Sequence, residues 1–171
     1  MEHHNFPHKG FTLIELLIVV AIISMTMAIG LPSFQSIIAS TRLTSATNAM
    51  VSALQLARFE AIKQHKAVVI RKKTTDWVGG WDIFVDSNAN NTQQVATEPT
   101  ITTFDALSST ITIAATYANY VNYGANGQAN EGGHFTFNSG TDWRCVIIAP
   151  TGRIRTVTKE TATTAEKKTC T

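Results

Sequence analysis

The sequence predicts an α+β fold in which one long N-terminal helix packs on a C-terminal antiparallel β-domain. Three observations support this fold class. An apolar run from Phe11 to Leu31 carries one charged residue, Glu15. Apolar residues then recur at spacings of three and four as far as about Lys66, which is typical of a helix with one buried face. The remaining chain consists of short β-branched and aromatic segments separated by Asn, Gly, Ser and Pro clusters, which is typical of strands and turns.

The apolar run has the length of a membrane span. Its 21 residues would cross the roughly 30 Å hydrocarbon core of a bilayer as a helix, so we predict the transmembrane half of the helix at residues 11–31. A carboxylate in such a run costs about 2.5–3.5 kcal/mol at the helix centre. Cleavage after Gly10 would place Glu15 one turn from the new amine of Phe11, at the positive end of the helix dipole.

The segment Lys9-Gly10-Phe11-Thr12-Leu13-Ile14-Glu15 resembles the class III signal of type IV pilins and pseudopilins. The resemblance implies that a prepilin peptidase removes the leader, residues 1–10, by cutting between Gly10 and Phe11, and that it methylates the amine of Phe11. In an assembly, Glu15 could pair with the amine of a neighbouring subunit. These features predict a single-pass protein whose N-terminal helix contacts the lipid of the inner membrane and whose head lies in the periplasm. After assembly, the protein is expected in a type IV pilus at the cell surface.

An ordinary secretory signal is the alternative for this segment. Ala28-Ile29-Gly30 is a loose match to the cleavage site of such a signal, which would release a secreted adhesin or binding module starting at Leu31. However, ordinary apolar signal cores run about 7–15 residues and carry no early carboxylate. The mature N-terminus, Phe11 or Leu31, distinguishes the two.

The amphipathic half of the helix is predicted at residues 32–66. Pro32 lacks a backbone donor, so we expect a kink or a locally loosened helix at residues 30–33. The alanine-rich face suits close packing on a sheet. The residues expected on that face are Leu43, Ala46, Met50, Ala53 or Leu54, Ala57 and Ala61.

Residues 67–171 are predicted to form a globular β-rich head folded over this helix. Short segments rich in Val, Ile, Thr and aromatic residues, separated by turn residues, predict eight strands. They are expected at 67–71, 80–85, 101–104, 111–115, 120–123, 134–137, 144–149 and 154–157.

The order of these segments is similar to that of minor pilins and pseudopilins of the GspH/FimT family. This resemblance implies a long helix with a β-sandwich-like head, which other pilins and minor pilins contact during pilus assembly or near the tip of a secretion pseudopilus. The residues that carry it lie at 31–34, 42–48, 54–63, 81–86 and 145–148.

Charge is unevenly distributed along the head. Residues 74–142 contain seven acids and no Lys or Arg, whereas residues 143–171 contain six Lys or Arg and two acids. The basic end is therefore a candidate anion-binding surface. It also holds both cysteines, Cys145 and Cys170. A metal site would need further His or Cys ligands, and none lies near them in the sequence, so a disulfide is favoured in a head outside the cytoplasm.

Arginines separated by one residue follow a Pro-Thr-Gly turn near the C-terminus. On a strand, Arg153 and Arg155 would project from one face and Ile154 from the other, into the core. Two guanidinium groups side by side can each make bidentate contacts with phosphate. The alternative is a solvated edge strand on which arginine prevents pairing with another chain.

Gly152-Arg153-Ile154-Arg155 matches the Gly-Arg-x-Arg motif associated with DNA binding by FimT-type minor pilins during natural transformation. The resemblance implies contacts with DNA phosphates that are independent of base sequence. Lys159, Lys167 and Lys168 follow the motif, and a Cys145–Cys170 disulfide would hold this tail near the strand.

Other candidate sites are weaker. Trp143 offers a ring for base stacking, but we expect it to be a core anchor. Arg71-Lys72-Lys73 could form a second phosphate contact, but we expect it to be a solvated strand end. Residues 86–90 alternate oxygen ligands as calcium loops do, but a calcium loop needs Gly and Glu where this chain has Asn91 and Thr97, so we predict a polar turn.

The sequence predicts no enzyme, metal or cofactor, because His65 and His134 lack partners at catalytic spacing. We therefore predict a minor type IV pilin of the FimT kind that binds extracellular DNA. The alternative is a GspH-like pseudopilin with a structural role in type II secretion.

Overall fold

The computed structural model describes residues 10–140 and 142–170, and of residues 29–33 it describes the backbone alone. Residues 1–9 of the predicted leader lie outside this description. Helix α1 spans Leu13–Gln64. Thr12 and Glu15 form a capping box at its start, in which the Glu15 carboxylate accepts hydrogen bonds from the Thr12 amide at 2.8 Å and the Thr12 hydroxyl at 2.9 Å.

The helical backbone is continuous through residues 29–33, so the loosening expected at Pro32 does not interrupt α1. Within the described residues, no helix is long and apolar enough to cross a membrane. The side chains of residues 29–31, at the end of the predicted span, are outside the description. The span at 11–31 stays a prediction.

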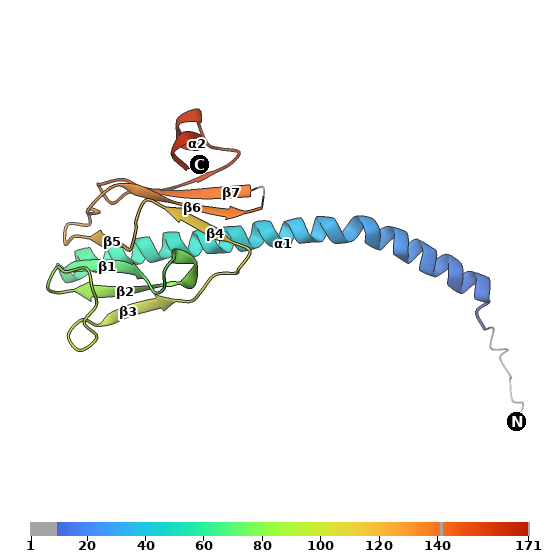
Figure 1. Ribbon diagram of the computed structural model, residues 1–171, viewed down its shortest axis with the longest axis horizontal. Helices are drawn as coiled ribbons and strands as arrows, with labels where there is room; N and C mark the ends of the chain where they lie inside the picture. Colours follow the sequence, from blue (N-terminus) through green and yellow to red (C-terminus); the bar gives the residue numbers. More distant parts are fainter. Residues whose placement is uncertain (1–9, 141, 171) are drawn as a thin grey trace, which may run out of the picture. The chain divides into compact units, whose positions relative to one another are not determined.

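The chain divides into two units, residues 1–38 and 39–171. The second unit contains the C-terminal part of α1 and eight strands (Figure 1). Every strand lies within two residues of its predicted bounds. They are β1 Ala67–Lys72, β2 Trp81–Asp86, β3 Thr100–Phe104, β4 Thr112–Ala115, β5 Tyr120–Tyr123, β6 Gly133–Ser139, β7 Asp142–Ile148 and β8 Ile154–Thr158. A short 3-10 helix, η1, spans Trp77–Gly79, and a second α-helix, α2, spans Thr164–Cys170.

The strands form two antiparallel four-stranded sheets. The first has the order β3-β2-β1-β5 and the second has the order β4-β6-β7-β8. The predicted α+β fold with an antiparallel β-sandwich-like domain is therefore confirmed.

One hydrophobic core joins α1 to both sheets. The predicted helix face is buried, because small alanine side chains let the helix backbone approach the strands closely. Trp77 contributes an edge-to-face contact with Phe135 of β6, with ring centroids 4.9 Å apart. The buried residues on the helix face are Leu43, Ala46, Met50, Ala53, Leu54, Ala57 and Ala61.

Cys145 and Cys170 form the expected disulfide, which joins β7 to the end of α2. Both sulfur-bearing residues are buried. Thr136 of β6 also donates its hydroxyl to the carbonyl oxygen of Cys170 at 3.0 Å. Helix α2 therefore lies against the second sheet, on the side away from α1 (Figure 1).

We expect removal of this disulfide to destabilise the head. The bond closes a loop of 25 residues, and the chain-entropy model assigns such a loop about 3.5 kcal/mol. The double substitution Cys145→Ala/Cys170→Ala should lower the free energy of unfolding by roughly this amount in a urea titration. Wild-type protein in reductant should match the variant. A reductant with no effect on the wild-type titration would contradict the prediction.

Candidate nucleic-acid interface

The register of the second sheet determines which side chains share its outer face. Cys145 pairs with Thr136 and Val157, and Ile147 pairs with His134 and Arg155. Because directly paired residues of antiparallel strands project to the same side, these two rows form the face that α2 covers in part. The core face carries the alternate residues, including Phe135, Val146 and Ile148.

Arg153 and Arg155 lie next to each other beside the part of this face that α2 covers. Both are exposed, and together with Ile147 and Ala149 they line a hollow of about 230 Å³. Ile154 is half-buried and packs against the core. The predicted alternation is therefore confirmed: the arginines share a surface and the isoleucine between them faces the opposite way.

Glu166 of α2 pairs with one of the two arginines. Its carboxylate lies 2.5 Å from the guanidinium of Arg155, whose side chain remains 51% exposed. Glu166 also accepts hydrogen bonds from the amide and the hydroxyl of Thr163, at 2.8 and 2.9 Å. This capping box starts α2. The acid therefore partly neutralises Arg155 while fixing the helix that carries Lys167 and Lys168.

The three lysines of the predicted interface, Lys159, Lys167 and Lys168, are exposed. Lys159 follows β8, and the other two lie in the last turn of α2. The disulfide at Cys170 holds this turn on the sheet that carries the arginines. Short helices have little stability on their own. The disulfide therefore helps to fix the position of Lys167 and Lys168 on the head.

Gly152 forms the turn that leads into Arg153. Its φ of +79° is costly for any residue with a Cβ, and its amide donates to the carbonyl oxygen of Ala149 at 2.8 Å. A Cβ at this position would also overlap the carbonyl oxygen of Gly127, in the loop after β5. Glycine is thus required here both by the backbone conformation and by the close approach of a second loop.

Arg58 of α1 holds these two loops together. Its Nε donates to the carbonyl oxygen of Gly127 at 3.0 Å, and its guanidinium reaches the carbonyl oxygen of Thr151 at 3.5 Å. The amide of Ala129 adds a hydrogen bond to the carbonyl oxygen of Pro150 at 3.0 Å. No local pattern in the sequence indicates this contact, because its partners lie 69 and 93 residues from Arg58.

A second hollow lies beside the Gly152 turn. It has a volume of about 380 Å³ and is lined by Gln55, Arg58, Phe59, Ile62, Arg153 and Ile154. Arg153 therefore borders both this hollow and the smaller one that contains Arg155. Neither of them is lined by an acidic side chain.

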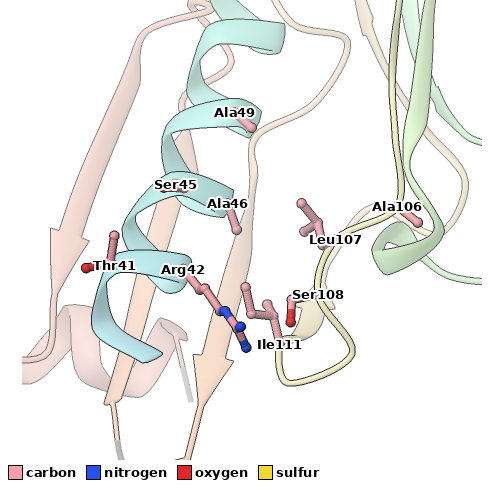
Figure 2. A pocket seen from close by; sticks show the side chains of 9 residues that line it. All are labelled: Thr41, Arg42, Ser45, Ala46, Ala49, Ala106, Leu107, Ser108 and Ile111. Atoms are coloured by element: carbon pink, nitrogen blue, oxygen red, sulfur yellow. The ribbon is translucent and has the colours of Figure 1, made fainter. Parts of the chain in front are cut away.

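A third hollow lies between α1 and the loop before β4 (Figure 2). It also measures about 380 Å³, and its wall is largely apolar, with the guanidinium of Arg42 close to Ile111. None of the residues of the predicted interface lines it.

Trp143 is not a core anchor, and this prediction was wrong. It is half-buried and lies outside the hydrophobic core. The reason is the register of β7, in which Trp143 alternates with Arg144 and shares the outer face with Cys145.

The basic segment at the end of β1, residues 71–73, makes local contacts. Arg71 donates to the carbonyl oxygen of Asn91 at 2.6 Å, and Lys72 donates to that of Thr75 at 2.7 Å. Lys73 lies 3.9 Å from the carboxylate of Asp105. These contacts agree with a strand end rather than with a second phosphate site.

Asp86 caps the polar turn that follows β2. Its two carboxylate oxygens accept the amides of Asn90 and Asn91 at 3.2 and 2.9 Å. The turn is therefore held by backbone donors. In the described part of the chain, no three His, Cys, Asp or Glu side chains gather as metal ligands.

Comparison with known proteins identifies the family. Residues 46–152, more than half of the chain, match the model of the type II transport protein GspH. The chain belongs to the GspH family. Residues 6–31 of this GspH-family protein also match the prokaryotic N-terminal methylation motif, which includes the predicted cleavage site at Gly10.

A fimbrial protein of Pseudomonas aeruginosa is 51% identical to this GspH-family chain over 61 residues, which is 36% of the chain and 39% of that protein. The chain thus spans about two fifths of the length of this relative. The crystal structure of the type IV minor pilin FimU from P. aeruginosa matches with a TM-score of 0.61 and 24% identity, over 73% of the chain and 95% of FimU. The minor pseudopilin EpsH from the type 2 secretion system of Vibrio cholerae matches with a TM-score of 0.53 and 10% identity, over 68% and 97%.

These findings place the chain in the GspH family and show that it has the fold of a minor type IV pilin and of a minor pseudopilin. Proteins of this family are structural and assemble with other pilins in a pilus or pseudopilus. The methylation motif implies that this GspH-family protein reaches such an assembly by way of the membrane.

Gly152→Ala should destabilise the head more than Gly140→Ala. Both glycines have positive φ, at +79° and +64°, which costs an L-residue about 1–2 kcal/mol. At Gly140 an added Cβ meets nothing within 4 Å, whereas at Gly152 it meets the Gly127 carbonyl. Urea titration of the two variants isolates the cost of the close approach. Equal losses would mean that the two loops separate without cost.

The stabilising effect of Glu166 should disappear in acid. Hydrogen bonds from the Thr163 amide and hydroxyl, followed by the charge of Arg155, hold the pKa of Glu166 below its ordinary value. A carboxyl whose pKa is lowered in the folded state stabilises that state above its unfolded pKa, and the effect is lost as the pH falls below about 4.5. Wild type should therefore exceed Glu166→Gln in unfolding free energy at neutral pH, and this difference should shrink as the pH is lowered below about 4.5. A difference that does not change with pH would contradict this.

Proposed function

We propose that this protein is a minor type IV pilin that takes part in pilus assembly and binds extracellular DNA during natural transformation. The observation that carries the proposal is the placement of Arg153 and Arg155. Both side chains are exposed and border the same hollow of the head. Two guanidinium groups at such a site suit adjacent phosphates of one strand.

The charges around Arg153 and Arg155 also favour DNA as the ligand. Of the two acids in residues 143–171, Glu166 is occupied by Arg155 and by the cap of α2. Lys159, Lys167 and Lys168 add exposed positive charge on the same tail. Contacts of this kind address phosphates rather than bases, so binding is independent of sequence and sensitive to salt.

The N-terminus supports entry into a pilus. We propose that prepilin peptidase cuts between Gly10 and Phe11 and methylates Phe11, both of which are exposed ahead of α1. Glu15 lies in the first turn of α1 and would face the amine of a neighbouring pilin in the filament. In the single chain the Glu15 carboxylate accepts hydrogen bonds from the amide and the hydroxyl of Thr12. Assembly would exchange these hydrogen bonds for an ion pair.

A pseudopilin with a structural role in type II secretion is the second candidate. The description of the matching family model favours it, and so does the position of β8 at the edge of its sheet. In that case the arginines on this edge strand would prevent pairing with another chain and would not bind a ligand. Absence of DNA binding by the protein would favour this candidate.

Arg153→Gln/Arg155→Gln should remove most DNA binding without unfolding the head. The test is fluorescence anisotropy with a labelled duplex and the full chain in nonionic detergent, between 50 and 200 mM salt. Loss of two phosphate contacts should reduce the slope of log affinity against log salt by roughly 1.8. The matched control is Arg42→Gln/Lys73→Gln, which removes the same charge from exposed positions elsewhere on the head.

The control pair should bind as the wild type does. If both double variants lose the same affinity, net charge rather than a site attracts DNA. If neither loses affinity, the assignment of Arg153 and Arg155 is wrong.

A further inference from the structure

Phe59 is an aromatic side chain that the head leaves in solvent. It lies on α1 with 60% of its surface exposed, and Ile62, one turn later, is 45% exposed. Their neighbours Ala57 and Ala61 are fully buried against the sheets. The two exposed side chains therefore lie off the buried face of α1, and burial in the core does not explain them.

These two side chains form one wall of the 380 Å³ hollow that Arg153 borders. Gln55, also exposed, supplies an amide to the same hollow. Arg153 lines this hollow and the one that contains Arg155. A path of hollows thus runs from Arg155 past Arg153 to Phe59.

One cation lies over the ring of Phe59. The ammonium of Lys63 lies 5.7 Å from the centroid of Phe59, within the range of a cation–π contact. The nearby acid Glu60 is engaged by Lys63 and Gln64, at 3.0 and 2.6 Å. An exposed aromatic ring beside a positive groove is the arrangement with which proteins bind single-stranded nucleic acid: bases stack on the ring and cations contact the backbone.

We propose that Phe59 is a stacking platform for a base of single-stranded DNA whose phosphates lie on Arg153 and Arg155. The inference rests on the proposed function and names its ligand as the single strand. In a duplex both faces of an internal base are already stacked, so only an unpaired base can use the ring. Gln55 is placed to hydrogen-bond the edge of such a base.

Contact with a neighbouring pilin is the other use for an exposed aromatic ring. Charge favours the base: Arg153 lines the same hollow as the ring, Lys63 lies over the ring, and no acid lines the hollow, so a polyanion complements such a site. An apolar partner would have to bury Arg153 without a counter-charge.

Phe59→Ala tests the proposal in the full chain in nonionic detergent. Affinity for a labelled single-stranded oligonucleotide should fall roughly five- to 150-fold, the range found when a stacking aromatic is replaced by alanine. Affinity for the matching duplex should not change. Phe59→Tyr keeps the ring and should bind as the wild type does. Val95→Ala removes an exposed apolar side chain from the loop before β3 and serves as the control.

Phe59→Trp adds a direct signal. The native Trp77 and Trp81 are buried and Trp143 is half-buried, so the new indole is the exposed reporter. Stacking on a base should quench its fluorescence with single strands and leave it unchanged with duplex. Val95→Trp should show no such difference.

The outcomes separate the two proposals. If Phe59→Ala binds single strands like the wild type while Arg153→Gln/Arg155→Gln loses both DNA forms, the stacking role is wrong and the phosphate site stands. If Phe59→Ala binds single strands like the wild type but no longer assembles into pili, Phe59 contacts a neighbouring pilin, and the stacking role is wrong. An equal loss of single-strand and duplex binding by Phe59→Ala overturns it as well. If the wild type binds neither form, the proposed function fails, and this inference fails with it.

Discussion

The contact between the Gly127 loop and the Gly152 turn connects the three layers of the head. Arg58 stabilises this contact through hydrogen bonds to both loops. Gly127 follows β5 of the first sheet, Gly152 joins β7 to β8 of the second, and Arg58 belongs to α1. The approach is so close that a Cβ at Gly152 would overlap the carbonyl oxygen of Gly127. This approach and the hydrogen bonds of Arg58 hold the turn that precedes Arg153 next to α1, beside the hollow that Arg153 lines.

A second constraint acts on the opposite side of the same arginine pair. The disulfide holds α2 on the outer face of the second sheet, and α2 in turn presents Glu166 to Arg155. Seven residues are too few for a stable isolated helix, so the cap by Thr163 and the covalent link at Cys170 compensate for its length. This arrangement weakens an anion site, because it places the carboxylate of Glu166 beside Arg155, one of the two arginines of that site.

Much of the fold could be predicted from the sequence because its signals are local. The spacing of apolar residues predicted the helix and its buried alanine face, and the β-branched and aromatic segments between turn residues predicted all eight strands. Helix α2 was missed because its threonine-rich sequence has no apolar period and depends on a disulfide for its place. Trp143 was misplaced because a shift of one position along β7 exchanges the two faces of a sheet. The hollow beside Phe59 could not be predicted, since it requires two loops and a helix that meet only in the folded chain.

The two arginines of the motif differ in how free they are to bind a ligand. Arg155 already has a partner in Glu166, so a phosphate must either displace that carboxylate or share the guanidinium with it. The Arg155 side chain is half exposed, so a phosphate can reach its guanidinium, whereas the Glu166 side chain is only 14% exposed. Arg153 is fixed by the backbone of the Gly152 turn and borders both hollows. It is therefore the natural anchor of the path, with Arg155 on one side for a further phosphate and Phe59 on the other for a base. A strand bound in this way gains its affinity from several modest contacts, any of which can be released without loss of the others.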